Sequence, residues 1–155
     1  MIAQDVSALW DRLVESRRAY ASASREFLAR KDRVEMLRES LRGEDRFAAL
    51  SVARSLNQDE KMQLFAEWVY LASWAHGAIQ LARDIILSLP RDWVLANIER
   101  ESEPYLQDGT YDEYRRFLEL YSQLDPELKS KLADRARQHS DPDIREAGED
   151  FAETP

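Results

Sequence analysis

Residues 6–41 read VSALWDRLVESRRAYASASREFLARKDRVEMLRESL, and this stretch decides the expected fold. An apolar residue recurs at every seventh position: Val6, Leu13, Tyr20, Phe27, Val34 and Leu41. The positions three residues after these hold Leu9, Ser16, Ala23, Arg30 and Leu37. A heptad of this kind is typical of a helix that packs along another helix. We therefore expect one long helix over 6–41, paired with an equally long helix of this chain or of a second copy.

A second long helix is expected over residues 58–89. Asn57 precedes it as an N-cap, and acidic residues follow in its first turn. Its apolar residues cover nearly the whole circumference, which predicts a central, buried helix. Residues 64–82 are largely apolar, but Glu67 and His76 interrupt them, so a core helix is expected and not a membrane span.

The second half of the chain predicts shorter helices, because all five prolines lie beyond residue 89. Pro90 stands near the start of one helix, and Pro104 and Asp108-Gly109 are expected to interrupt the chain after it. Asp-Pro at 125–126 and at 141–142 supplies an N-cap followed by a residue preset for the first helical position. The expected short helices are 111–123, 126–138 and 142–151.

These patterns together predict an all-α fold in which long, antiparallel, coiled-coil-like helices pack against a short stack of helices. We expect a single helical domain over residues 1–155. Its parts would be a long-helix part at 1–89, the short helices at 90–151 and a tail at 152–155.

The short helices also resemble a known family of repeats. The motifs are Leu118-Glu119-Leu120-Tyr121, then Leu128, Leu132 and Ala136, then His139-Ser140-Asp141-Pro142-Asp143-Ile144-Arg145-Glu146-Ala147. This pattern, over about residues 88–151, resembles a HEAT-like helical repeat, although Gly148 stands where such repeats usually have alanine. The resemblance implies stacked helix pairs that bind other proteins, and it brings no catalytic residue with it.

Charge is spread unevenly along the chain, whose formal net charge is -8. Residues 1–43 carry nine bases and seven acids, residues 44–98 five and seven, and residues 99–155 eight and sixteen. The acidic last third could steer a basic partner. The arginines between residues 12 and 42 alternate with acids, so a solvated helix flank is expected and nucleic-acid binding is not.

The residue types needed for several kinds of chemical site are missing. The chain has no cysteine, and neither His76 nor His139 follows a glutamate by three residues, as a di-iron bundle requires. His76 is expected in the core or at its boundary, and His139 at a helix end. Glu67 is expected on a partly exposed stripe with Tyr70 and Trp74, with a structural hydrogen bond or a functional acid as alternatives. No catalytic, cofactor-binding or metal-binding residue is predicted.

The function expected from these features is a non-enzymatic protein-interaction module, an adaptor or a subunit of a larger bacterial assembly. The start of the chain lacks the order of a signal peptide, and a cytoplasmic location is expected. Homo-oligomerisation through residues 6–41 is one option. Two alternatives stay open: an acidic immunity or antitoxin-type inhibitor of a basic partner, and a small helical subunit of a nucleoprotein (defence) complex. The candidate partner-binding residues are Tyr70, Trp74, Glu146, Glu149 and Asp150.

Overall fold

The computed structural model describes residues 2–152, with side chains from Val6 onward. Within this range the protein is all-helical, so the all-α prediction is confirmed. The ten described helices are α1 (Ile2–Leu28), α2 (Arg33–Arg42), α3 (Arg46–Ala53), α4 (Gln58–Gln63), α5 (Phe65–Ala72), α6 (Ile79–Leu87), α7 (Arg91–Gln107), α8 (Tyr111–Leu124), α9 (Pro126–Arg137) and α10 (Pro142–Ala152). Of the expected tail at 152–155, Ala152 ends α10 and the rest lies outside the described residues.

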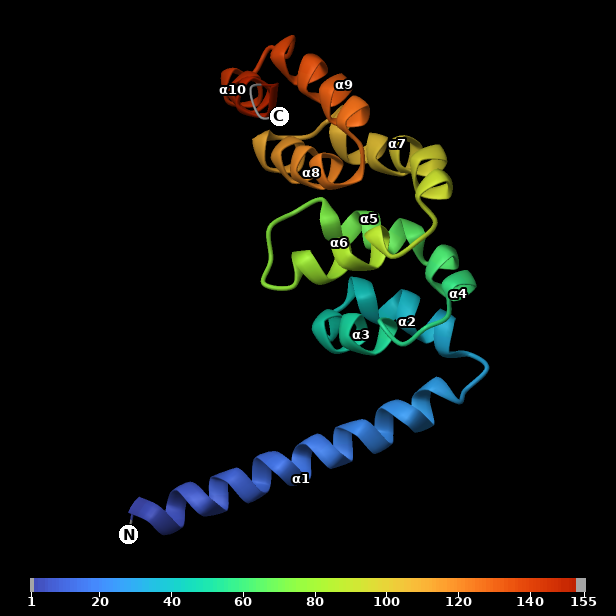
Figure 1. Cartoon of the computed structure of the whole chain (residues 1–155), viewed down its shortest axis with the longest axis vertical. Coiled ribbons are helices and arrows are strands. Elements are labelled where there is room, and N and C mark those ends of the chain that lie inside the picture. Colours follow the sequence, from blue (N-terminus) through green and yellow to red (C-terminus); the bar gives the residue numbers. More distant parts are fainter. Residues whose placement is uncertain (1, 153–155) are drawn as a thin grey trace.

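The helices after α1 form a stack of antiparallel pairs. The pairs α2–α3, α5–α6, α7–α8 and α9–α10 lie one above another, and α4 leads into the second pair (Figure 1). One continuous set of buried apolar side chains runs through this stack, from Leu37 in α2 to Ala147 in α10. Among the described helices, none is long and apolar enough to cross a membrane.

The first long helix is shorter than expected, because α1 ends at Leu28 and α2 begins at Arg33. Neither glycine nor proline marks this turn. The Arg30 guanidinium instead donates two hydrogen bonds to the Asp32 carboxylate, at 2.8 and 2.7 Å. Arg33 donates to the carbonyl oxygen of Arg30 at 2.6 Å. These polar contacts hold a bend that the heptad does not reveal, so the prediction of one helix over 6–41 is wrong.

The second long helix is also broken, first at Leu64 and again over residues 73–78. The predicted cap is confirmed: the Asn57 side chain accepts the Glu60 N–H, and the Glu60 carboxylate accepts the Asn57 N–H. Polar groups form the second break, where Ser73 donates to the Tyr70 carbonyl oxygen and His76 accepts the Ala78 N–H. The predicted long-helix part at 1–89 is therefore a protruding helix followed by two layers of the stack.

The helices of the second half agree closely with the prediction. Asp125 caps α9 by accepting the N–H groups of Glu127 and Leu128, and Asp141 accepts the N–H of Asp143 in α10. The expected break at Pro104 is wrong, since α7 continues through it to Gln107. Pro104 and Arg100 are both exposed, so water can solvate the carbonyl group that proline leaves without its helical bond.

Gly148 allows α10 to pack closely on α9. A Cβ atom at this position would lie 2.8 Å from the carbonyl oxygen of Ala133, 2.8 Å from the backbone nitrogen of Arg137 and 2.9 Å from the Cβ of Ala136. Two of these neighbours are backbone atoms, which cannot move aside as a side chain can. The glycine at position 148 therefore has a packing reason.

We expect Gly148→Ala to lower the free energy of unfolding by about 1–3 kcal/mol, because the added methyl group overpacks the α9–α10 contact. Urea unfolding followed by far-UV circular dichroism measures the change. Gly77→Ala is the matched control, since nothing lies within 4 Å of a Cβ there and its φ is not positive. Equal stabilities of the two variants would contradict this account of the close approach.

Candidate interaction surface

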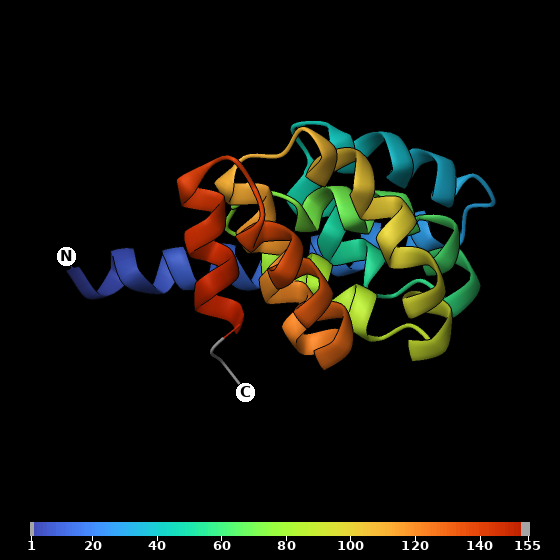
Figure 2. The same ribbon diagram turned by 90° about the horizontal axis from the view of Figure 1, so that it is seen from above.

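Helix α1 projects from one end of the stack (Figure 1). It carries a row of exposed apolar side chains. The exposed fractions are 60% for Val6, 54% for Leu9, 63% for Trp10, 61% for Leu13 and 49% for Tyr20. Seen from above, α1 also runs beyond the edge of the stack (Figure 2). Of its described side chains, Phe27 and Leu28 pack against the core, where they are half-buried. The predicted seam therefore exists as a stripe along α1, but most of it has no helix to pack against among the described residues.

The stripe widens on one side into a shallow recess. Its volume is about 360 Å³, and its lining residues are Trp10, Leu13, Val14, Arg17, Arg18 and Ala21. Lysine and arginine can lay their aliphatic stems along apolar surface while the charged end stays in water. The two arginines therefore border an apolar floor and leave it open to a partner.

The charges of α1 do not form one basic face. Arg18 and Arg25 share one side of the helix with Asp11, whereas Arg12 and Arg17 lie on two other sides, and Glu15 and Glu26 lie between Arg12 and the Arg18 side. A helix that tracks a phosphate backbone concentrates its positive charge along one side. The apolar stripe is thus the continuous feature of this helix.

Tyr70 and Trp74, two of the predicted partner-binding residues, lie together at the edge of the stack, with ring centroids 6.4 Å apart. Arginines from the α2–α3 region cover them: Arg42 lies 4.6 Å from the Tyr70 ring and Arg46 5.2 Å from the Trp74 ring. Cation–π contacts of this kind favour the stacked position of the guanidinium groups. Both aromatic rings are half-buried, so this cluster offers a partner the outer edges of its rings and the arginines above them.

Glu67 is buried and not part of an exposed stripe, which corrects the sequence-based expectation. Its side chain lies in α5, and the residue is 4% exposed. Its carboxylate accepts a hydrogen bond from Arg42 at 2.6 Å and lies 3.9 Å from Arg38. Both arginines belong to α2, so the ion pair joins the first two layers of the stack. Of the three interpretations of Glu67, the structural hydrogen bond matches the geometry.

We expect Glu67→Gln to lower the free energy of unfolding by about 1–3 kcal/mol, because a buried charge-assisted hydrogen bond is lost. Chemical denaturation at neutral pH measures this change. Glu35→Gln is the control, because Glu35 pairs with Arg38 from an exposed position and such pairs contribute little. An unchanged unfolding midpoint for Glu67→Gln would show that the pair does not hold the layers together.

The acidic candidates lie far from this cluster, at the other end of the stack. Glu146, Glu149 and Asp150 are exposed on α10, and Asp150 pairs with Arg115 of α8 at 2.6 Å. Helix α10 belongs to the last layer of the stack and α5 to the second (Figure 1). The structure therefore does not bring the two groups of predicted partner-binding residues together. Many other acids of the last third are engaged in ion pairs, including Glu99 with Lys131 and Glu103 with Arg135.

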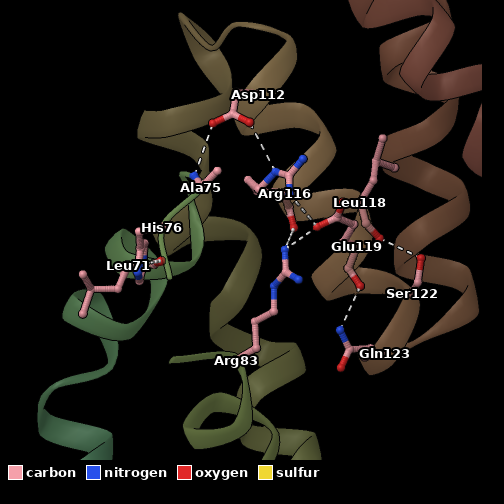
Figure 3. A network of polar contacts seen from close by, with 10 residues as sticks. All are labelled: Leu71, Ala75, His76, Arg83, Asp112, Arg116, Leu118, Glu119, Ser122 and Gln123. Atoms are coloured by element: carbon pink, nitrogen blue, oxygen red, sulfur yellow. Dashed lines mark hydrogen bonds and ion pairs between the residues drawn. The ribbon is translucent and has the colours of Figure 1, made fainter. Parts of the chain in front are cut away.

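A polar network joins α6 to α8 on one side of the stack (Figure 3). The buried Arg83 donates to the Glu119 carboxylate at 2.6 Å and to the Arg116 carbonyl oxygen at 3.3 Å. Asp112 lies 3.3 Å from the Arg116 guanidinium and accepts the backbone N–H of Ala75. The contacts of Arg83 with α8 and of Ala75 with Asp112 link neighbouring layers, and the Asp112–Arg116 pair lies within α8. The network therefore serves packing. The apolar periodicity of the sequence did not predict this network, because it indicates only that α6, which carries Arg83, is a largely apolar helix.

Both histidines have structural roles. The Nδ1 atom of His76 accepts the Ala78 N–H, and its Nε2 atom lies 2.7 Å from the Leu71 carbonyl oxygen and donates to it. The Nδ1 atom of His139 likewise accepts the Asp141 N–H. His76 therefore lies at the boundary of the core, in a turn, and His139 lies at a helix end, as expected. Within the described residues, no group of three or more histidine, aspartate or glutamate side chains is placed to hold a metal ion.

A small recess of about 120 Å³ lies between α7, α8 and α9. On its floor the Ser102 and Tyr121 hydroxyl oxygens are 2.6 Å apart, and the ion pairs Glu99–Lys131 and Glu103–Arg135 lie at its rim. Burial raises the pKa of Tyr121 to about 12, and its hydrogen bond with Ser102 lowers the pKa by less. The phenol is therefore neutral over the physiological range, and it serves as a hydrogen-bond partner and not as a base.

The raised pKa of Tyr121 predicts a loss of stability in alkali. An unfolded tyrosine ionises near pH 10 and the folded one near 12, so stability should fall by roughly 2–3 kcal/mol between these values. Urea unfolding at pH 9 to 12 should show a smaller loss for Tyr121→Phe than for the parent. Tyr20→Phe is the control, because that ring is exposed, and it should leave the alkaline loss unchanged. An identical pH profile for all three proteins would contradict the burial argument.

Comparison with protein-family models, with curated proteins and with solved structures finds no match to this chain. The surface is therefore interpreted from its own geometry. The sequence analysis identified the apolar positions of α1 and expected a partner helix for them, in this chain or in a second copy. Their exposure could not be read from the heptad, because the same pattern suits a partner within the chain or outside it.

Proposed function

We propose that this protein is a non-enzymatic interaction module that assembles with a protein partner through the apolar stripe of α1. The observation that carries the proposal is the exposure of Val6, Leu9, Trp10, Leu13 and Tyr20 on a helix that leaves the stack. Contiguous exposed apolar surface of this kind marks interaction sites on soluble domains. Tryptophan and tyrosine are also the residue types that contribute most to binding at interfaces.

Helix energetics support the same proposal. An isolated helix is only marginally stable in water, and most helical stability in proteins comes from packing of an apolar face. Along most of α1 this packing is missing within the chain. A partner that covers the stripe would stabilise the helix by on the order of 1 kcal/mol for each large side chain that it buries further.

The buried and half-buried ionisable groups support binding in preference to catalysis. Glu67 is held by Arg42, and the Nδ1 atoms of His76 and His139 accept backbone N–H groups. Tyr121 is bonded to Ser102 on the floor of a recess with only about 120 Å³ of space. Each of these groups already has a structural partner. The stacked helix pairs would then act as a scaffold, in keeping with the HEAT-like resemblance of residues 88–151.

We expect the double variant Leu9→Ser/Leu13→Ser to lose the assembly that the parent protein forms, because it removes two central apolar contacts. The free energy of unfolding of its stack should stay within about 0.5 kcal/mol of the parent value, since both side chains are exposed. The measurements are size-exclusion chromatography with light scattering and co-purification from the native host.

The control for this experiment is Asp11→Ser/Arg25→Ser. Both residues are exposed on the side of α1 away from the stripe, and the double change leaves the net charge unaltered. This control should retain assembly. If Leu9→Ser/Leu13→Ser retains it as well, the interaction surface lies elsewhere on the molecule and the proposal is wrong.

A further inference from the structure

The stripe of α1 alternates between bulky and small residues in a regular way. The every-seventh positions hold Leu13, Tyr20 and Phe27, whereas the companion positions after the first hold Ser16 and Ala23. Leu9 is the one bulky companion residue in α1. A partner helix that fits this seam needs small residues opposite the bulky ones and bulky residues opposite the small ones.

We propose that the occupant of the stripe is α1 of a second copy, paired antiparallel with its centre near residue 18. This inference rests on the proposed function and names its partner. In an antiparallel pair the every-seventh positions of one helix face the companion positions of the other. Tyr20 then faces Ser16 of the second copy, and Leu13 faces its Ala23. Leu9 meets the exposed edge of Phe27, which is half-buried on the stack of the second copy.

A parallel pair of the same helices fits much less well. Each layer would then contain the same residue twice, so that two Tyr20 rings would crowd one layer. The layers at Ser16 and Ala23 would contain small side chains from both helices and leave space between them. Cavities and overpacking both reduce stability in a packed seam.

Charge complementarity also favours the antiparallel pair. Arg12 and Glu26 flank the seam on the same side, and in the antiparallel register Arg12 of each copy lies opposite Glu26 of the other. In the parallel register Arg12 would lie opposite Arg17, twice, and like charges at these positions repel. The antiparallel pair has a single unfavourable contact, Arg17 with its own copy at the centre of the other flank.

The shape of the molecule leads to the same arrangement. The stack joins α1 at one end of that helix, and residues 33–155 carry 16 bases and 25 acids (Figure 1). A parallel pair would place two strongly acidic stacks side by side. An antiparallel pair centred near residue 18 separates the two Leu28 positions, where the stacks are joined, by about 30 Å along the axis, well beyond the roughly 8 Å screening length at physiological salt.

Spin labels on single cysteines test the direction of pairing, because the natural chain has no cysteine. For Ser7→Cys, an antiparallel pair centred near residue 18 separates the two labelled positions by about 33 Å along the helix axis. A parallel pair keeps them at the same height, at roughly the 10 Å distance between packed helix axes. Arg18→Cys is the control, because its two labels lie at the same height in either arrangement. Pulsed electron paramagnetic resonance measures both distances on the full chain.

Charge variants test the register by the dimer dissociation constant, measured by sedimentation equilibrium. Arg12→Glu places two glutamates opposite each other in the antiparallel pair, so we expect dimerisation to weaken by roughly 10-fold. Adding Glu26→Arg should restore the parent affinity. In a parallel pair Arg12→Glu would instead face Arg17 and strengthen the dimer, which would overturn the inference.

The outcomes separate this inference from the proposed function. A protein that stays monomeric over a wide range of concentrations overturns the self-pairing. If Leu9→Ser/Leu13→Ser nevertheless loses a partner in the host, α1 remains an interaction helix with a different protein on it. Short distances for labelled Ser7→Cys overturn the antiparallel arrangement even where a dimer forms.

Discussion

Burial of α5 is the constraint on which the stack depends. This helix packs against α4, α6, α7 and α8 and against α2 from the first layer, and Trp68, Val69 and Leu71 are fully buried in it. A helix that is apolar on every side must be enclosed by others. The polar groups of its two buried polar side chains are both satisfied: the Trp68 indole donates to the Lys61 carbonyl oxygen, and the Glu67 carboxylate binds Arg42. The layers on either side of α5 are held in place because each of them covers part of its surface.

The presence of helices and the residues that cap them could be predicted from the sequence far better than the lengths of the helices. Asn57, Asp125 and Asp141 are local signals, since a cap acts within three residues of its own position, and all three behave as predicted. The breaks at residues 29–32 and 73–78 depend on side chains that bond to the backbone in one particular bend. Arginine, serine and histidine side chains make these backbone hydrogen bonds only when the chain is already bent. The apolar periodicity therefore continues through both breaks and does not predict them.

The candidate interaction surface, too, could be predicted from the sequence only in part. The apolar positions of α1 were identified from their spacing, but a heptad does not say whether its partner is in the same chain. Tyr70 and Trp74 were expected on a partly exposed stripe. The structure adds the arginines that cover them, which come from about 28 residues earlier in the chain. The burial of Glu67 could not be predicted for the same reason, because Arg42, which pairs with its carboxylate, is also remote in the sequence.

The bend at residues 29–32 gives small local changes a large geometric effect. Helix α1 is a rod about 40 Å long that is anchored only near its C-terminal end among its described residues. A rotation of about 10° at the bend would therefore displace the free tip by roughly 7 Å, while the stack stays where it is. The ion pair between Arg30 and Asp32 lies at this bend, exposed to solvent and to dissolved ions. Salt screens such an exposed pair more strongly than the partly buried Arg42–Glu67 pair within the stack, so added salt weakens a contact at the bend before it weakens those between the layers.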